Sequence, residues 1–588
     1  MTKCNSCAII SGEKMFTRIT TVVKNGQAYR YLSLVENYRQ NGKVRQKLIH
    51  SLGALTNPAT KTAVESLVYK LRRYTNQGFF TPEELSTEKA QLFAPPLVGK
   101  FLWDKLQITE TIKKLTAGKK IAFDLPLYLL TLTLNHLIAP RSDLAVSRWY
   151  KQIYLKELED KEPHWYNFYR ALDYLSRIKE KLEAHLFNQL CDLFSLEVNL
   201  VFYDLTTTYF EGQGPEIAKP GYSKEHKKGT RQILVALAIT EDGFPIATEI
   251  YPGNYPECYT LSTVLANLSQ RFKIKRCILV CDRGLVSEKN LKDIKDHGYE
   301  YIVALKSRDK KVFKLIDPDL KNYQRLDEHL LTKEISSGEP GKRFIICHNE
   351  ERAFREAEER QELLDRLTAS LQKLAVWYAR GEIKDQKEVI TRLGNLLSSG
   401  PKRKLIRYWF EGKGRFMFEV NKSVLNQEKI IDGKTVIHTE VSDLSSEKIV
   451  QTYRSLSRIE NCFRDLKSIL KIRPLRHYTE RRIKAHIFVC VLALLLERML
   501  EVSLARKKYP ITATHALEIL SEVKITTNTL KNGTREFKVK CVTPIEGQAA
   551  KILGYFGLAK VQRTIVTPAS PNPKKGVDFS DEVPTTFL

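Results

Sequence analysis

The strongest constraint on the fold is the succession of short apolar segments between residues 196 and 309. Five of these segments are predicted to be strands, because they are rich in branched and aromatic residues and are bounded by turn residues. Strands are predicted over residues 198–204, 232–240, 245–251, 277–282 and 299–306, and helices over residues 261–272 and 287–297. The first three strands follow one another directly, which favours antiparallel pairing, whereas the later helical connections favour parallel pairing. The sequence therefore predicts an α/β core with a mixed sheet covered by helices.

The rest of the chain differs in character from this core, and two Asn-Gly pairs near the N-terminus are strong hairpin signals. We expect the following regions in chain order: a β-meander whose basic residues could face a phosphate backbone or water (1–54), a helical region (55–195), the first part of the core (196–309), an insertion subdomain of strands and helices (310–445), a long helix and an apolar helix of the core (446–500), a mostly helical C-terminal region (501–566) and a flexible tail (567–588).

The net charge of +27 is concentrated towards the two ends of the chain. The first 120 residues carry +12 and residues 401–588 carry +15, so that the middle is almost neutral. Two basic ends suggest two surfaces that bind polyanions. Surplus Lys residues that maintain solubility would give the same count, and composition alone leaves both interpretations open.

Three classes of protein are not indicated by the sequence: membrane-spanning, disulfide-rich and nucleotide-binding. The longest apolar run, Ile487–Leu496, has ten residues, whereas a spanning helix needs about 20. The ten Cys residues are scattered, and Cys4 and Cys7 have no second ligand pair nearby that would complete a zinc site. No Gly-x4-Gly-Lys-Ser/Thr loop for nucleotide phosphates is present. We therefore expect a cytoplasmic protein that uses neither a membrane nor a nucleotide.

Two acidic residues stand at the ends of predicted strands in the core. Asp204 follows Val201-Phe202-Tyr203, and Asp282 follows Leu279-Val280-Cys281. Functional sites form at strand ends in α/β sheets, and a carboxylate in such a place needs a partner. If the two strands are neighbours, the carboxylates converge, and a bound Mg²⁺ or Mn²⁺ would offset their repulsion. Two solvated turn aspartates remain the alternative.

A third acid lies on a long helix predicted over residues 445–472. Its apolar residues recur at spacings of three and four, which predicts one buried stripe, at Leu456, Ile459, Phe463, Leu466 and Leu470. An adjoining face carries one acid among cations and an aromatic residue, at Tyr453, Glu460, Arg464, Lys467 and Lys471. This face suits a metal ligand beside phosphate contacts, although an ordinary surface ladder with a Glu460–Arg464 pair is the alternative. Residues 454–484 contain ten Lys or Arg against three acids, which extends the basic track.

Together, these residues resemble the Asp-Asp-Glu (DDE) transposases of bacterial insertion sequences. The resemblance rests on Asp204 in YDLTTTYFEG, Asp282 in VCDRG and Glu460 in the basic helix, and the last two are 178 positions apart. The branch that is resembled has a ribonuclease H-like core with a β-rich insertion at this gap. Its signature of Tyr, two residues, Arg, three residues, Glu, six residues and Lys is matched by Tyr453, Glu460 and Lys467. Leu456 stands where the signature has Arg, and Arg464 is the residue that we prefer for the role of that Arg.

The resemblance implies an enzyme that cuts and joins DNA by two-metal phosphoryl transfer. Asp204 would bridge two Mg²⁺ or Mn²⁺ ions roughly 3.5–4 Å apart, with Asp282 and Glu460 each holding one side. Cleavage at the ends of the mobile element would leave a 3′-OH, which would then attack target DNA. Tyr453, Arg464, Lys467 and Lys471 are the expected DNA contacts.

The resemblance also implies that the partner is double-stranded DNA, both element ends and target, and that the chain acts as a homodimer on DNA near the nucleoid. A metal-dependent nuclease of the same fold that cuts without joining is one alternative to this function. A DNA-binding relative without catalytic activity is another.

Overall fold

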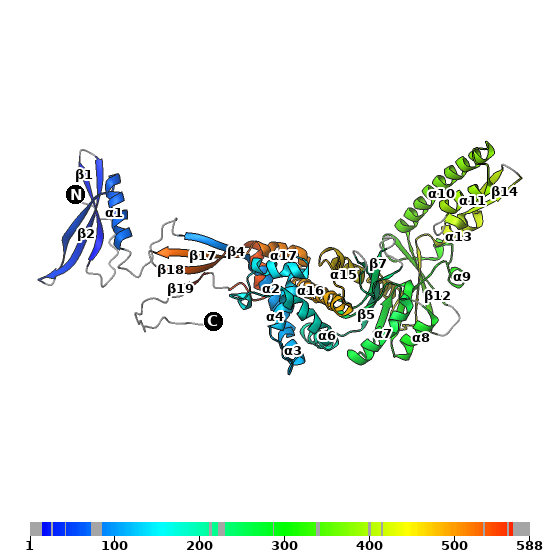
Figure 1. The fold of residues 1–588 in the computed structure, drawn as a ribbon, viewed down its shortest axis with the longest axis horizontal. Helices are drawn as coiled ribbons and strands as arrows, with labels where there is room; N and C mark the ends of the chain where they lie inside the picture. Colours follow the sequence, from blue (N-terminus) through cyan, green and yellow to red (C-terminus); the bar gives the residue numbers. More distant parts are fainter. Residues whose placement is uncertain are drawn as a thin grey trace. The chain divides into compact units, whose positions relative to one another are not determined.

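The structure is a computed structural model, and its helices and strands are labelled in Figure 1. The described residues are 15–24, 27–41, 43–71, 85–210, 214–221, 230–285, 287–336, 341–397, 402–412, 415–532, 535–560 and 564–568. The chain divides into two compact units. The first consists of Met1–Gln91, Lys524–Pro544 and Lys560–Leu588, and the second of Leu92–Val523 and Ile545–Ala559. The Cys4–Cys7 pair, Asn25-Gly26, Gly42 and residues 569–588 of the predicted tail lie outside the described residues.

The first unit contains the predicted β-meander. Strands β1 (Met15–Lys24), β2 (Gln27–Gln40) and β3 (Lys43–Ala54) pair antiparallel in sequence order, and helix α1 (Pro58–Leu71) follows. Asn41, between β2 and β3, has a φ of 50°, the left-handed backbone that an Asn-Gly turn favours.

A second sheet of the first unit joins segments that lie far apart in the sequence. Its strands are β4 (Leu85–Leu92), β17 (Lys524–Asn532), β18 (Arg535–Val542) and β19 (Thr564–Pro568), in the order β19-β18-β17-β4. The region 55–195 is therefore not helical throughout, since it contributes β4. The C-terminal region has the order helix, hairpin and helix that residues 511–557, with a turn at Asn532-Gly533, predict: α17 (Ala513–Ser521), the β17–β18 hairpin and α18 (Gly547–Tyr555). Strand β19 includes the first two residues of the predicted tail, and its pairing with β18, like that of β4 with β17, is not revealed by a local pattern.

The second unit is built around a mixed ten-stranded sheet with the order β11-β12-β13-β16-β10-β9-β5-β7-β6, and β8 pairs with β7. The strands are β5 (Leu200–Tyr209), β6 (Lys219–Pro220), β7 (Arg231–Thr240), β8 (Pro245–Pro252), β9 (Ile278–Cys281), β10 (Glu300–Leu305), β11 (Gln324–Arg325), β12 (Leu330–Ser336), β13 (Arg343–Asn349) and β16 (Lys434–Thr439). Strands β5, β9 and β10 are parallel neighbours, and β5, β7 and β8 are antiparallel neighbours. The predicted mixed sheet and its pairing directions are confirmed.

The segment 310–445 was expected to be an insertion subdomain, but part of it belongs to this sheet. Its strands β11, β12, β13 and β16 extend the sheet beyond β10, and β16 pairs antiparallel with β10. The part between β13 and β16 has a hydrophobic cluster of its own. That part comprises α10 (Glu350–Ala379), α11 (Gln386–Leu396), α12 (Lys402–Leu405), β14 (Ile406–Phe410), β15 (Phe416–Val420) and α13 (Lys422–Ile431). The sequence predicted that residues 310–445 contain strands and helices, but it did not predict which strands pair with each other.

The helices of the second unit form two groups. The group around α16 (Glu480–Arg506), the predicted apolar helix, comprises α2 (Ala94–Lys105), α3 (Ile108–Leu115), α4 (Leu125–Ile138), α5 (Asp143–Trp149), α6 (Trp165–Phe194), α17 (Ala513–Ser521) and α18 (Gly547–Tyr555). Helices α7 (Thr260–Ala266) and α8 (Glu288–Asp296) contact each other, and α8 contacts β10 of the sheet. Helix α16 contacts α4, α6 and β8, and nearly every residue from Ile483 to Leu496 is buried. No helix among the described residues is long and apolar enough to cross a membrane.

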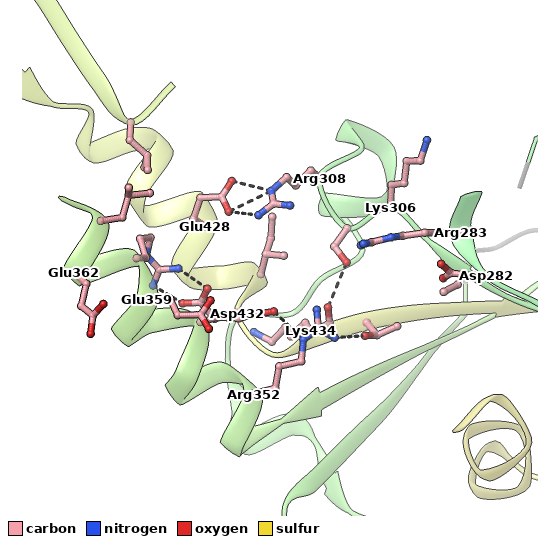
Figure 2. A pocket seen from close by; sticks show the side chains of 18 of the residues that line it. Asp282, Arg283, Lys306, Arg308, Arg352, Glu359, Glu362, Glu428, Asp432 and Lys434 are labelled. Carbon is pink, nitrogen blue, oxygen red and sulfur yellow. Dashed lines mark hydrogen bonds and ion pairs between the residues drawn. The ribbon is translucent and has the colours of Figure 1, made fainter. Parts of the chain in front are cut away.

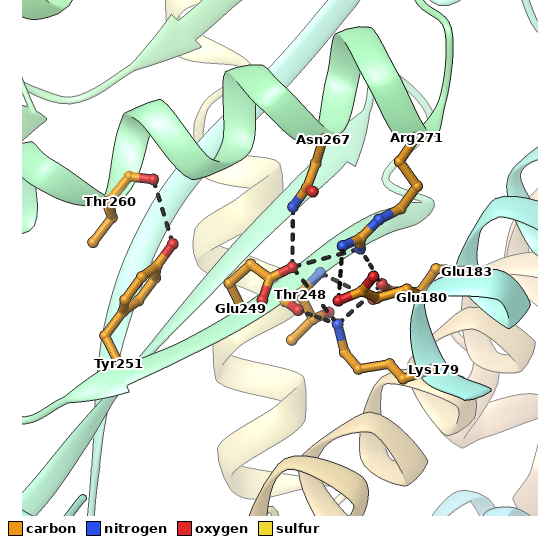
Figure 3. A network of polar contacts seen from close by, with 9 residues as sticks. All are labelled: Lys179, Glu180, Glu183, Thr248, Glu249, Tyr251, Thr260, Asn267 and Arg271. Carbon is orange, nitrogen blue, oxygen red and sulfur yellow. Dashed lines mark hydrogen bonds and ion pairs between the residues drawn. The ribbon is translucent and has the colours of Figure 1, made fainter. Parts of the chain in front are cut away.

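A buried network of charges joins α6 to the sheet (Figure 3). The Glu183 carboxylate lies 3.0 Å from Lys179 Nζ and 2.7 Å from Arg271 Nη1, and Arg271 Nη1 also lies 3.5 Å from Glu249 on β8. Lys179 also donates a hydrogen bond to the backbone oxygen of Thr248. Burial raises the pKa of Glu183 to about 6 although the two cations oppose this shift. Glu180, which is largely exposed, also lies 3.6 Å from Arg271. In the buried part of the network the two cations face Glu183 and Glu249, so the charges are compensated where water is excluded.

Candidate active site

Asp204 and Asp282 lie at the same level of two neighbouring strands. Strands β5 and β9 are parallel, and Tyr203 pairs with Cys281, so the next residue on each strand is the acid. Asp282 follows the end of β9, as predicted. Asp204 does not end its strand, because β5 continues to Tyr209 and pairs with β7 along its whole extension. Both acids are partly buried. Their adjacency therefore comes from the parallel register and not from two strand ends.

The predicted helix over residues 445–472 is two helices, α14 (Ser446–Arg454) and α15 (Ser457–Ser468). At Ser455 and Leu456 the backbone tightens, since the amides of Leu456, Arg458 and Ile459 each bond to the carbonyl three residues earlier. The apolar stripe from Leu456 to Leu470 is buried throughout, which confirms its predicted packing. The tighter turn changes the angular relation of α14 to α15, so the polar residues on the two helices do not form one continuous face.

Glu460 joins the two aspartates in one pocket. It lies in the first turn of α15 and is exposed. The pocket has a volume of about 910 Å³, and its lining includes Asp204, Asp282, Glu460, Arg464 and Lys467. Three acids and two of the predicted phosphate contacts, from two strands and one helix, therefore share one pocket.

The donor set of this pocket suits a hard divalent cation. Carboxylate oxygens are the ligands that Mg²⁺ prefers in proteins, and Mg²⁺ usually takes only one or two of them together with water and phosphate. Among the residues that the structure describes, the groups of three whose ligand atoms all lie within 4.8 Å of one another are elsewhere in the molecule. The oxygen atoms of the three carboxylates are therefore not all within 4.8 Å of one another, although the three residues line the same pocket. A bound ion would need additional oxygen ligands there.

The Arg side chains near Leu456 contact different parts of the structure. Arg454 pairs with Asp327 at 2.5 Å, and Arg458 donates a hydrogen bond to the backbone oxygen of Glu241. Arg464 is exposed and lines the pocket. Among the Arg residues flanking the Leu456 position, Arg464 is the one that borders the acids.

Tyr453 and Lys471 lie outside this pocket, contrary to the predicted common face. Tyr453 lines a neighbouring pocket of about 930 Å³, where burial above all, and then the charge of Asp282, raise its pKa. Lys471 follows α15 with a φ of 48°, and Ile472 closes the helix end through a hydrogen bond to the Leu466 carbonyl. The helix ends before Lys471, so the lysine does not share the face of Glu460.

Asp282 borders both pockets, together with Arg283 and Lys306. Figure 2 shows these three residues at one side of the neighbouring pocket and ion pairs that involve α10 and α13 at the other side. One of these pairs, Arg308 with Glu428, is 2.7 Å long. The segment between β13 and β16 thus forms a wall of the space next to the acids.

Some residues of the site were not identified from the sequence. Glu257 adds a fourth carboxylate to the lining of the acidic pocket, and no local pattern distinguishes it from a loop acid. A separate buried cluster outside that pocket contains His136, Asp143, His477, His486 and Cys490. Its only local signal is the spacing of His486 and Cys490, which are four residues apart on one helix.

Two family matches cover most of the chain. Residues 199–496, about half of the chain, match the transposase DDE domain, and residues 16–84 match the N-terminal domain of the IS1634 family transposases. No curated protein matches the chain. The first match contains all three acids of the pocket.

Two solved structures show a distant likeness. The synaptic complex of piggyBac transposase with hairpin DNA shares 8% identity over 76% of this chain and 82% of that chain, with a TM-score of 0.36. The Argonaute of Marinitoga piezophila in complex with a 5′-OH guide RNA shares 9% identity over 56% of this chain and 72% of that chain, with a TM-score of 0.14. Both scores are too low to define the fold, whereas the family matches are decisive. The chain belongs to the DDE transposases of insertion sequences.

Proposed function

We propose that this transposase cuts DNA at the ends of a mobile element and joins the freed 3′-OH to target DNA. One observation above all supports the proposal: Asp204, Asp282 and Glu460 line a single pocket with two cations. The sheet around β5, β9 and β10 is proposed to be a ribonuclease H-like core.

Asp204, Asp282 and Glu460 are proposed to hold two Mg²⁺ or Mn²⁺ ions, with Asp204 contributing to both. Their carboxylate oxygens are the donors that these ions prefer. The ions, when bound, supply an activated oxygen nucleophile and stabilise the charge on the leaving oxygen. Because joining exchanges one phosphodiester for another, the chain needs no nucleotide as an energy source.

The cations of the pocket are proposed to bind the DNA backbone beside the bond that is cut. Arg464 takes the role of the Arg that the family signature places at Leu456, and its planar guanidinium can bind a phosphate through two hydrogen bonds. Lys467 adds a second positive charge on the same helix. Tyr453, from the neighbouring pocket, and the exposed Lys471 are proposed as more distant DNA contacts.

The basic regions are proposed to extend this DNA-binding surface. Residues 401–588 carry +15, with ten Lys or Arg between residues 454 and 484. The N-terminal meander is proposed to contact the element ends, and the helical region 55–195 to contribute to DNA binding or dimerisation. A homodimer would bring two element ends together, and the chain would act in the cytoplasm at the nucleoid.

The test removes one carboxylate at a time. Asp204→Asn, Asp282→Asn and Glu460→Gln should each abolish Mg²⁺-dependent cleavage of a plasmid carrying the two element ends, while DNA binding in a mobility-shift assay is retained. Asp296→Asn is a matched control, because Asp296 is an exposed acid at the end of α8. Cleavage at the wild-type rate by any of the three variants would contradict the assignment.

The same assay separates the two alternatives. A plasmid target in the reaction reports joining, so cleavage without strand-transfer products would identify a nuclease of the same fold. Absence of cleavage by the wild-type chain in both Mg²⁺ and Mn²⁺, with DNA binding intact, would identify a relative without catalytic activity.

A further inference from the structure

The buried cluster of His, Asp and Cys side chains lies among the helices of the second unit and shares no residue with the acidic pocket. His136 comes from α4, Asp143 from the first position of α5, His477 from the segment before α16, and His486 and Cys490 from α16. Every one of the five side chains is at least nine-tenths buried. Five polar groups from separate segments in one buried place need compensation, because each would otherwise lose its hydration.

Hydrogen bonds among the described residues compensate this cluster only in part. Asp143 Oδ1 and His486 Nδ1 are both buried and have no hydrogen-bond partner in the described part of the chain. His486 Nδ1 lies 3.7 Å from Asp143 Oδ2, which is too long for a hydrogen bond. Buried polar atoms of this kind are uncommon in native proteins, and they show that the cluster is not satisfied by its own hydrogen bonds.

The distances to the Cys490 sulfur fit two ligands of one metal ion. Cys490 Sγ lies 3.9 Å from His486 Nε2, and it lies 3.7 Å from Nδ1 and 3.9 Å from Nε2 of His136. A tetrahedral zinc ion with Zn–S of about 2.3 Å and Zn–N of about 2.0 Å separates a sulfur ligand from a nitrogen ligand by about 3.6 Å. The sulfur therefore lies near this spacing from a nitrogen of each imidazole, and one ligand atom of each of the three residues lies within 4.8 Å of the other two.

Each of these imidazoles also has its second nitrogen directed towards an oxygen. His136 Nδ1 lies 2.8 Å from the backbone oxygen of Leu470, to which it can donate, leaving Nε2 as the metal ligand. His486 Nδ1 faces Asp143 Oδ2, and Asp143 Oδ2 lies 2.7 Å from His477 Nε2. A metal-binding His usually donates its other N–H to a carboxylate or a backbone carbonyl, as His136 can to Leu470, whereas His486 Nδ1 would have to move closer to Asp143 to do so.

The contact between Asp143 and His477 indicates that these two residues bind each other and are not both ligands of one metal ion. Their 2.7 Å separation is that of a hydrogen bond and is shorter than the spacing of two ligands on one zinc ion. Asp143 and His477 thus satisfy each other in part, whereas His136, His486 and Cys490 stand further apart around a common point.

We propose that His136 Nε2, His486 Nε2 and Cys490 Sγ bind a Zn²⁺ ion, and that Asp143 and His477 orient His486 from behind. A thiolate with two imidazoles is a soft donor set that favours zinc over magnesium, so this ion is distinct from those proposed for the carboxylates. The fourth position is left for water. The site joins α4 to α16, and through the Leu470 carbonyl it also reaches the segment that follows the helix of Glu460.

The first experiment measures the metal content of the full-length chain. Protein expressed with Zn²⁺ and then desalted should retain about one zinc per chain, whereas His486→Ala and Cys490→Ala should retain at least tenfold less. Cys462→Ala is the matched control and should retain zinc, because Cys462 is a buried Cys on α15 whose sulfur faces the Gly243 carbonyl and no imidazole. Asp282→Asn should also retain zinc, which separates this site from the acidic pocket.

A second measurement uses the wild-type chain, so its result does not depend on whether a variant folds. The wild-type chain, freed of zinc and supplied with Co²⁺, should show a thiolate-to-cobalt charge-transfer band, and added Zn²⁺ should abolish it. Wild-type protein that keeps no zinc after desalting and shows no such band would overturn the proposal. Equal zinc retention by the wild type and the Cys490→Ala variant would overturn it as well.

Discussion

Replacing Glu497 with Gln should stabilise the second unit by an amount that grows with pH. Glu497 lies on α16, is 3% exposed, and its Oε2 accepts no hydrogen bond from the described residues. The guanidinium of the neighbouring Arg498 pairs with Asp465. Its nitrogens also lie 2.8 Å from a carboxylate oxygen of Glu501 and 3.8 Å from one of Glu497. One guanidinium therefore faces three carboxylates. Burial raises the pKa of Glu497 to about 8, and Asp465 and Glu501 add to the shift while Arg498 opposes it.

The size of the effect follows from this pKa. Glu497 is protonated in both the folded and the unfolded chain below pH 4.5, so its ionisation has no effect on stability there. As the pH rises from 4.5 to 8, the unfolded chain loses the proton first, and the folded chain is destabilised by about 1.4 kcal/mol per pH unit. The loss reaches about 3 kcal/mol at pH 7 and about 5 kcal/mol above pH 8. Gln at this position does not ionise and avoids that loss.

The assay is urea unfolding followed by tryptophan fluorescence at pH 5.5, 7 and 8.5. The free energy of unfolding of Glu497→Gln, relative to wild type, should rise by about 3 kcal/mol between the lowest and the highest pH. Glu522→Gln, at an exposed residue that follows α17, makes the same chemical change and should show no such trend. A difference between Glu497→Gln and wild type that does not change with pH would refute the reasoning, because it would mean that the buried carboxyl is already ionised at pH 5.5.

Three further predictions concern packing, the charge network and DNA binding. Leu466→Ala removes a side chain of α15 that is 1% exposed, and should lower the free energy of unfolding by about 2–5 kcal/mol in urea titrations. Lys179→Met leaves Glu183 and Glu249 with a single cation, Arg271, and should cost about 3–5 kcal/mol at pH 7; the loss should shrink below pH 6, where Glu183 takes up a proton. Lys467→Ala should weaken DNA binding and reduce the slope of log K against log salt concentration by about 1, measured by fluorescence anisotropy; an unchanged slope would exclude a phosphate contact.

Local patterns were sufficient for the elements that carry the three acids. The apolar runs around Asp204 and Asp282 predicted two strands, and the connections between them predicted which neighbours are parallel. The stripe that includes Leu466 predicted the buried face of α15. These features depend on side chains close together in sequence, where periodicity of burial is strong.

The features that the sequence did not predict depend on contacts between distant segments. Strand β16 finds its place beside β10, and β4 beside β17, through backbone pairing that leaves no local mark on the residues. The tightening at Ser455 occurs where the sequence pattern is still that of one helix. His136 and Cys490 are 354 positions apart, so their proximity is a property of the packed helices alone.

Because β13 and β16 pair antiparallel, the first and last residues of the segment between them lie next to each other. The Asn349 amide donates to the Gly433 carbonyl at 2.9 Å, and a Cβ at position 433 would lie only 2.4 Å from the Asn349 oxygen. The 83 positions between them in the chain therefore leave and re-enter the sheet at one point, as a loop of any length could. Evolution can lengthen, shorten or exchange this segment without changing the strand order. A shortened version would keep all three acids but would lack part of the wall beside Asp282.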